Sequence, residues 1–390
     1  MTEAPSGRSI LAAPLTLRGL TLRNRVMISP MCTYSAVEGM LNDFHLVHLG
    51  RFALGGAGLI FVEATAVSRR GRITHGCSGL WDDAQVEPLR RIAAFLRGQG
   101  AAAGIQLSHA GHKGSSQRPW EGSGPLGEAD AQARGDDPWE PEGVTENPFD
   151  DGWAQPQRMS EDDIGTVIGE FAAAARRADA AGIDVAEIHC AHGYLLHSFL
   201  SPISNTRTDC WGGDLEGRMR MSLEVARAVR AVWPEGKPLF VRISSVDGVD
   251  VGWTIEDSVA FARELKTLGV DVVDCSSGGM KLPKLQNFLW RGPGFHVSFA
   301  ERVRRESGLP TVAVGLIRSA EQAEAILADG KADIIAIGRE ALFHPNWAGE
   351  AALRLDGADA WATWPEQFGW WLVRRAKQER DGYGERKAVG

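Results

Sequence analysis

Apolar residues recur along the chain in short, nearly continuous runs. Each run ends at a polar residue or a glycine, and an amphipathic stretch usually follows. Runs without polar alternation are typical of parallel strands that are buried on both faces. Eight runs fit this description and predict strands at 26–29, 58–63, 103–107, 184–189, 239–243, 270–275, 311–314 and 333–337.

Apolar residues at helical spacing fill the intervals between these strands. Ser160 with Asp163 three residues later predicts an N-cap, and Ser319 with Gln322 predicts a capping box. The clearest predicted helices are 83–99, 160–181, 215–232, 254–268 and 319–328.

This alternation predicts a single (β/α)8 TIM barrel domain over residues 1–390, with a doubly wound sheet as the alternative. Residues 114–157 break the alternation after the third strand and are rich in Gly, Pro, Asp and Glu. We interpret them as an extended loop insertion that is either a lid over the catalytic face or a solvated surface excursion. Its tryptophans, Trp120, Trp139 and Trp153, favour the lid.

Composition excludes several classes of protein. A hydrophobic fraction of 44% in 390 residues can form a sizeable core, which excludes disorder as a description of the whole chain. A net charge of −8 disfavours nucleic-acid binding. None of the five cysteines lies at CxxC spacing, which disfavours structural zinc and iron–sulfur clusters. Without an apolar run of about 18 residues we expect no membrane span, and we expect a cytoplasmic protein.

Reactive residues gather at the carboxyl ends of the predicted strands, where barrel enzymes carry their active sites. The first strand leads into Cys32 and Tyr34, and the fourth into the pair His189 and His192 and then Tyr194. The other ends carry Gln106, His109 and Lys113 after the third strand, Arg242 at the fifth, Ser276 to Gly279 after the sixth, Gly315 after the seventh and Gly338 with Arg339 after the eighth.

Each of these groups has an alternative interpretation. The histidine pair could donate hydrogen bonds to an oxyanion, bind a metal ion or serve structure alone. The two tyrosines could act as general acids or pack at the barrel rim. Arg242 could contact an anionic ligand or pair with Glu187, and Cys32 could be inert.

The last three strand ends indicate an anion site. Gly278, Gly315 and Gly338 can offer unobstructed backbone N–H groups, and Arg339 adds a guanidinium. Barrels often hold phosphate at the loops after the seventh and eighth strands.

Taken together, these segments resemble the Old Yellow Enzyme family of flavin-dependent ene-reductases, and most closely its thermophilic-like branch with the bacterial xenobiotic reductases. The resemblance covers nearly the whole chain. It rests on SPMCTYS at 29–35, VEATAV and GRIT within 62–74, GIQLSHAGHK at 104–113, IHCAHGYLLHSFLSPISNTRTD at 188–209, FVRIS at 240–244, AVGLI at 313–317 and IGRE at 337–340.

The resemblance implies an FMN-dependent enzyme that uses NADPH or NADH to reduce the C=C bond of α,β-unsaturated carbonyl compounds, and also nitro compounds. It implies that His189 and His192 hold the substrate oxygen, that Tyr194 donates the proton, that Tyr34 flanks the substrate and that Cys32 tunes the flavin. The implied FMN contacts are Ser29, Pro30, Met31, Cys32, Ala64, Gln106, Arg242, Gly278, Gly315, Gly338 and Arg339.

The resemblance further implies a homodimer or homotetramer without a metal. Trp290 and Trp371 are expected to contact substrate. Trp371, or Trp370 in its place, is expected to reach a neighbouring subunit from a C-terminal tail at 361–390, and the alternative is that the tail plugs its own subunit. The chain departs from many relatives at His112, where they carry Arg. A metal-dependent hydrolase, a redox sensor acting through Cys32 and a dienoyl-CoA-type reductase are the competing hypotheses.

Overall fold

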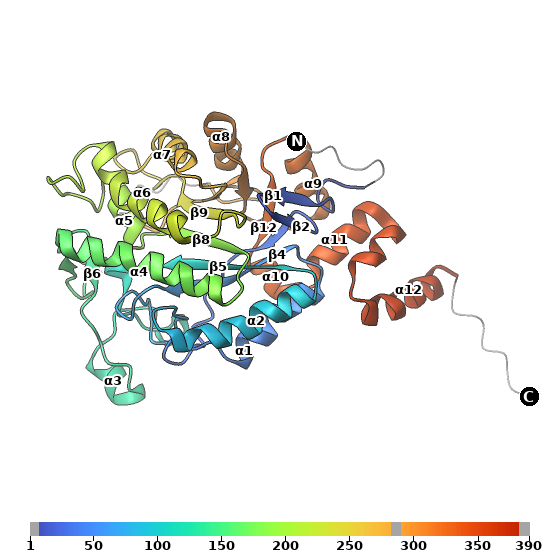
Figure 1. The fold of residues 1–390 in the computed structure, drawn as a ribbon, viewed down its shortest axis with the longest axis horizontal. Helices are drawn as coiled ribbons and strands as arrows, with labels where there is room; N and C mark the ends of the chain where they lie inside the picture. Colours follow the sequence, from blue (N-terminus) through green and yellow to red (C-terminus); the bar gives the residue numbers. More distant parts are fainter. Residues whose placement is uncertain (1–7, 282–289, 382–390) are drawn as a thin grey trace, which may run out of the picture.

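The computed structural model describes residues 8–281 and 290–381. Eight parallel strands close into a barrel, which confirms the predicted (β/α)8 architecture (Figure 1). Each predicted strand lies in this barrel, with ends that differ by a few residues. In order around the barrel the strands are β3 (Val26–Ile28), β4 (Leu59–Ala66), β5 (Ala102–Ser108), β8 (Val185–Cys190), β9 (Leu239–Ser244), β10 (Val272–Ser276), β11 (Thr311–Ala313) and β12 (Ile334–Ile337).

Helices surround the barrel, and their starts follow the capping signals in part. Ser160 Oγ accepts from the backbone N–H of Asp163 at 3.2 Å, and the Asp163 carboxylate accepts from Ser160 N in return. Ser319 caps Gln322 in the same way, but Gln322 Oε1 accepts from Arg318 N, so the predicted reciprocal box is half formed. The surrounding helices are α1 (Asp43–Leu54), α2 (Val86–Gly98), α4 (Glu161–Ala180), α6 (Leu215–Val232), α7 (Ile255–Thr267), α8 (Val297–Ser307), α9 (Ala320–Ala328) and α11 (Trp347–Asp356).

Two apolar cores hold the barrel together. One lies between the strands and the helices, and the other fills the inside of the barrel. The inner core includes Met27, Phe61 and Phe240, and the hairpin of β1 (Leu15–Leu17) and β2 (Leu20–Leu22) packs against it. The inside of the barrel is therefore solid side chain, and this leaves the carboxyl ends of the strands for a ligand.

The insertion at 114–157 contains secondary structure of its own. It carries η3 (Pro119–Glu121), α3 (Glu128–Arg134) and β6 (Glu142–Gly143), and β6 pairs with β7 (Gln157–Arg158). Arg118 and Arg134 both form ion pairs with Asp136, at 2.7 and 3.5 Å. The insertion is thus an ordered excursion, and its movement as a lid stays a prediction.

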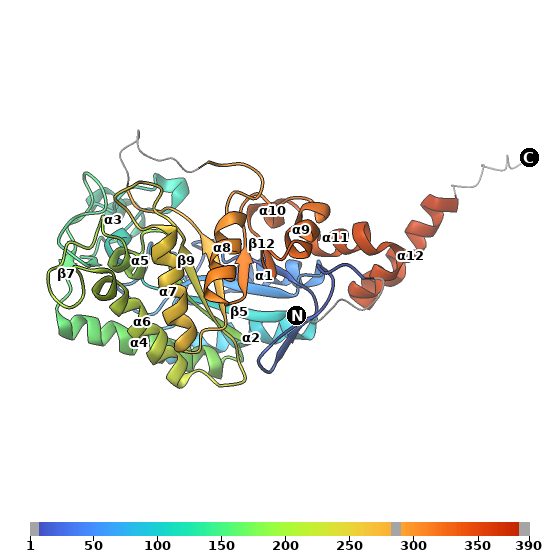
Figure 2. The ribbon, with the colours of Figure 1, turned by 90° about the horizontal axis from the view of Figure 1, so that it is seen from above.

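The C-terminal segment extends away from the barrel. After η4 (Gly357–Thr363), helix α12 (Glu366–Asp381) projects from the body of the molecule in both views (Figures 1 and 2). Trp370 and Trp371 of α12 are 52% and 64% exposed. Residues 382–390 of the predicted tail lie outside the described residues. Over the described ranges, no helix has the length and apolar character needed to cross a membrane.

Candidate active site

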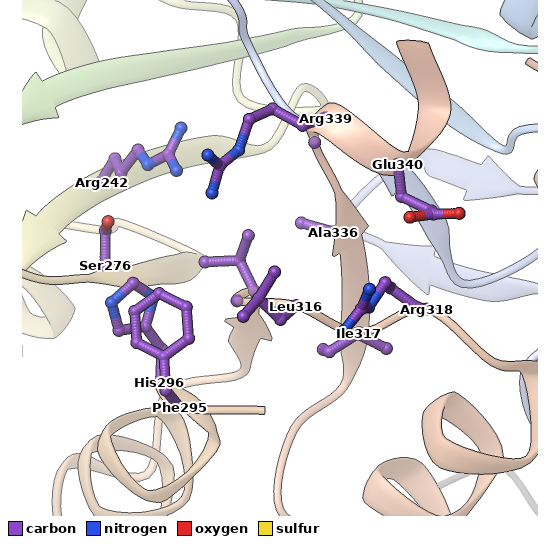
Figure 3. Close-up of a pocket in the computed structure, with 13 residues that line it drawn as sticks. Arg242, Ser276, Phe295, His296, Leu316, Ile317, Arg318, Ala336, Arg339 and Glu340 are labelled. Carbon is purple, nitrogen blue, oxygen red and sulfur yellow. The ribbon is translucent and has the colours of Figure 1, made fainter. Parts of the chain in front are cut away.

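A cavity of about 410 Å³ opens at the carboxyl ends of β9 to β12 (Figure 3). Four of the predicted residues meet in its wall, namely Arg242, Gly315, Gly338 and Arg339. Arg242 from β9 and Arg339 at the start of α10 (Arg339–Phe343) reach toward the same space from opposite sides. Two guanidinium groups beside glycine backbone form a site for a phosphate or another anion.

Other cavity residues are Ser276, which the sequence marked after the sixth strand, and three residues that the sequence did not single out. These three are Phe295, His296 and Arg318. His296 is buried, and its Nε2 shares a hydrogen bond of 2.7 Å with Ser277 Oγ. Its Nδ1 has no hydrogen-bond partner among the described residues. Burial lowers the pKa of His296 to about 3, so the ring is neutral. A lone histidine ahead of a helix gave no usable signal in the sequence.

Arg242 has a different protein partner from the one considered above. Its Nε lies 3.2 Å from Asp274 Oδ2 on the next strand, whereas Glu187 accepts from Gln106 Nε2 at 2.8 Å. The pairing with Glu187 is therefore wrong, because strand register puts Asp274 directly opposite Arg242. Burial raises the pKa of Glu187 and of Asp274, and Arg242 opposes the rise at both. Arg242 also lines the cavity wall, where its guanidinium can contact a ligand.

The histidine pair and Tyr194 form one cluster after β8. The rings of His189 and His192 lie 5.1 Å apart between centroids, and Tyr194 lies 5.1 Å from His189. His189 Nδ1 accepts from the backbone N–H of Ala191, so its proton is on Nε2, which is 3.4 Å from His192 Nδ1. His192 Nε2 is 2.7 Å from Ser276 Oγ. Burial, and next the charge of Arg242, hold the pKa of both histidines well below the usual value.

Cys32 and Tyr34 lie beside this cluster, on a loop held by Glu63. Together with Tyr194 they pack against the same small apolar group. The buried Glu63 carboxylate accepts from Thr33 N, from Thr33 Oγ1 at 2.7 Å and from His45 Nε2 at 3.1 Å. Burial raises the pKa of Tyr34 and Tyr194, and burial with the Glu63 charge raises the pKa of Cys32. All three groups are therefore protonated at neutral pH.

The remaining predicted residues fall into two groups: those near the carboxyl ends of β3, β4 and β5, and those that lie away from the cavity. Ser29 and Ala64 are buried at the ends of their strands, and Ser29 Oγ has no partner among the described residues. Pro30 and Met31 continue the β3 end, and Gln106 lies inside the barrel on β5. Gly278 lies outside the cavity wall, with its N–H donated to Val246 O at 3.0 Å. Trp290 is 67% exposed beside the undescribed segment, and Trp371 lies on α12 away from this cluster.

A family model for the NADH:flavin oxidoreductase / NADH oxidase family matches residues 11–356. The chain belongs to this family. The match confirms the resemblance to the Old Yellow Enzyme family. The chain is 43% identical over 348 residues to an NADPH dehydrogenase of Bacillus subtilis, covering 89% of this chain and 95% of that protein. It is 41% identical to an NADH:flavin oxidoreductase of Gibberella zeae, and the match covers 86% of this chain and 83% of that protein.

Solved structures show the same fold. A morphinone reductase variant in complex with tetrahydroNAD superposes with a TM-score of 0.72 at 25% identity, covering 89% of this chain and 91% of that one. A 2-naphthoyl-CoA reductase superposes with a TM-score of 0.78 at 22% identity, but this chain spans only 52% of its length. The relatives of similar length thus match this chain over about nine tenths of its length.

This oxidoreductase uses FMN, with NAD(P)H as the electron donor. The cavity fits that cofactor, because Arg242, Arg318 and Arg339 line it and the buried Nδ1 of His296 in its wall has no partner among the described residues. Over residues 8–281 and 290–381, no three His, Cys, Asp or Glu side chains converge as ligands for a metal ion.

Proposed function

We propose that this enzyme is an ene-reductase that reduces the C=C bond of α,β-unsaturated carbonyl compounds, and also nitro compounds. The carrying observation is that two neutral histidines and a protonated tyrosine meet beside the anion-binding cavity. Bound FMN would supply the hydride chemistry that links NAD(P)H to the β-carbon of the substrate. The protein supplies orientation and electrostatics.

The histidine pair polarises the substrate in this proposal. We infer that Ser276 Oγ donates to His192 Nε2, which lies 2.7 Å away, and this places the proton of that ring on Nδ1. Two N–H groups, His189 Nε2 and His192 Nδ1, then converge on one substrate oxygen from positions 3.4 Å apart. Charge that develops on that oxygen is stabilised, and the β-carbon becomes electrophilic. A single donor of this kind contributes roughly 10²–10³ in rate.

Tyr194 donates the proton to the α-carbon in this proposal, and Tyr34 forms the facing wall. Tyr194 is held protonated by burial and lies next to His189. A buried phenol is a weak acid. Transfer of its proton therefore needs the carbanion character that hydride addition produces at the α-carbon. Cys32, on the same loop as Tyr34, tunes the cofactor from its position beside Glu63.

Two arginines hold the cofactor. Arg339, Gly315 and Gly338 would hold the FMN phosphate, and Arg242 would supply positive charge beside the ring system. The residues that would line the ring are Ser29, Pro30 and Met31 just after β3, Ala64 on β4 and Gln106 on β5.

We also propose that the enzyme is a homodimer or homotetramer in which α12 contacts a neighbouring subunit. Phe368, Trp370, Trp371 and Val373 leave a large apolar surface on this projecting helix. In this arrangement Trp371 reaches the active site of the neighbouring subunit and contacts substrate there. Trp290 lies at the entrance of the active site of its own subunit.

Visible absorption of the purified protein tests the proposal. The flavin spectrum should bleach with anaerobic NADPH and return when cyclohexenone is added. A spectrum that bleaches but does not recover with enones or nitro compounds would exclude the proposed substrates. His189→Ala is the matched variant, because it should keep the spectrum while weakening binding of phenol, which mimics the substrate oxygen.

A further inference from the structure

The turn that carries His192 has an unfavourable backbone conformation. His192 and Gly193 have φ of 61° and 74°, in the left-handed region that disfavours residues with a Cβ. The turn also touches the loop after β10 directly. A Cβ on Gly279 would lie 2.1 Å from the carbonyl carbon of His192, and one on Gly193 would lie 2.3 Å from Gly279 O. Such a turn persists only when its surroundings hold it.

Two side chains bridge the turn and the loop. Lys113 Nζ donates to His192 O at 2.7 Å and to Gly279 O at 2.6 Å. Ser244 Oγ accepts from His192 N at 2.9 Å and donates to Gly278 O at 2.7 Å. The N–H and the C=O of His192 are therefore both tied to the Gly278–Gly279 loop, from two different strand ends.

The bridge made by Lys113 is shielded by the insertion. The Phe149 ring lies 4.3 Å from Lys113 Nζ, and the Tyr194 ring lies 5.4 Å away on the active-site side. Burial lowers the pKa of Lys113 to about 7. The amine and the ammonium form each have at least two N–H groups, so either can serve both carbonyls.

We propose that Lys113 and Ser244 are positioning residues, which fix His192 against the Gly278–Gly279 loop and so set the spacing of the two imidazoles around the substrate oxygen. This inference rests on the proposed function, in which that oxygen lies between His189 and His192. Displacement of one donor by about 1 Å is enough to cost about 10²-fold in rate. The two residues act through the backbone of His192 and do not touch the substrate.

The test compares FMN-loaded Lys113→Met and Ser244→Ala with Lys237→Met as the matched control. Lys237 Nζ makes the same kind of bridge, to Ile183 O at 2.6 Å and Asp179 Oδ1 at 2.7 Å, but away from the active site. Each enzyme is titrated with p-hydroxybenzaldehyde, a phenol, and the change in flavin absorption gives Kd. FMN content and Tm are measured in parallel.

We expect Kd to rise at least tenfold in Lys113→Met and severalfold in Ser244→Ala, with FMN content retained. Lys237→Met should lower Tm but leave Kd within twofold of the wild type. Unchanged Kd in both site variants, or an equal rise in Lys237→Met, would overturn the inference. If Lys113→Met does not fold, Ser244→Ala decides alone. A wild-type enzyme that binds no phenol would instead refute the proposed function itself.

Discussion

Burial sets the protonation state of nearly every side chain around His192. The same low-dielectric surroundings keep the histidines neutral and keep Cys32, Tyr34 and Tyr194 protonated. Uncharged donors suit a site where charge develops only during the reaction, because they cost little to desolvate beforehand. Arg242, which pairs with Asp274, contributes the largest nearby cationic charge, and Lys113 contributes less.

Substitution Tyr194→Phe separates the two half-reactions. Removing the hydroxyl removes the proposed proton donor but keeps the ring that packs against His189. We expect oxidation of the reduced enzyme by cyclohexenone to slow by about 10²-fold or more, while reduction by NADPH stays within a fewfold of the wild type. Stopped-flow absorption measures both steps. Equal slowing of both would show that Tyr194 acts on binding and not on proton transfer.

Thiol labelling tests the environment of Cys32. Its raised pKa means that the folded protein holds less thiolate than the unfolded chain at any pH near 9. Exposed Cys210 should therefore react first with iodoacetamide, and Cys32 should stay largely unlabelled from pH 7 to 9. Mass spectrometry of peptides gives both rates, with urea-unfolded protein as the control. Labelling of Cys32 as fast as Cys210 at pH 7 would contradict the described surroundings.

At the scale of elements, the strands were predictable and several site contacts were not. Continuous apolar runs mark strands buried on both faces, so all eight barrel strands could be located from the sequence. The short hairpin of β1 and β2 was missed, because its pattern of Leu-Thr-Leu is too brief to distinguish from a loop. The partner of Arg242 was missed because strand register, which pairs it with Asp274, is a property of the closed barrel.

Capping is the local signal with the most direct energetic consequence. Ser160 and Asp163 form a reciprocal box at the start of α4. Ser160→Ala should lower the free energy of unfolding by about 1 kcal/mol. Urea denaturation measures the change, with Ser298→Ala, an exposed serine in the first turn of α8 but not at its cap, as the control. Equal effects of the two substitutions would show that the cap contributes nothing specific.

At the scale of the whole molecule, α12 has an apolar surface that residues 8–281 and 290–365 do not cover. Deleting residues from 365 onward should leave the barrel folded with FMN bound, since family matching ends at residue 356. We expect the deletion to reduce the oligomer to a smaller species in light scattering, and Trp371→Ala to change enone preference while keeping the oligomer. If assembly and preference both survive the deletion, α12 has no role between subunits.

The hairpin of β1 and β2 and the inner core close the base of the barrel. In the proposed function, dinucleotide and alkene then share the mouth at the carboxyl ends of the strands, and we expect them to bind there in turn. The first product has to depart before the second reagent enters. Steady-state turnover should consequently follow a ping-pong scheme, with parallel lines in double-reciprocal plots and inhibition when either reagent is in large excess.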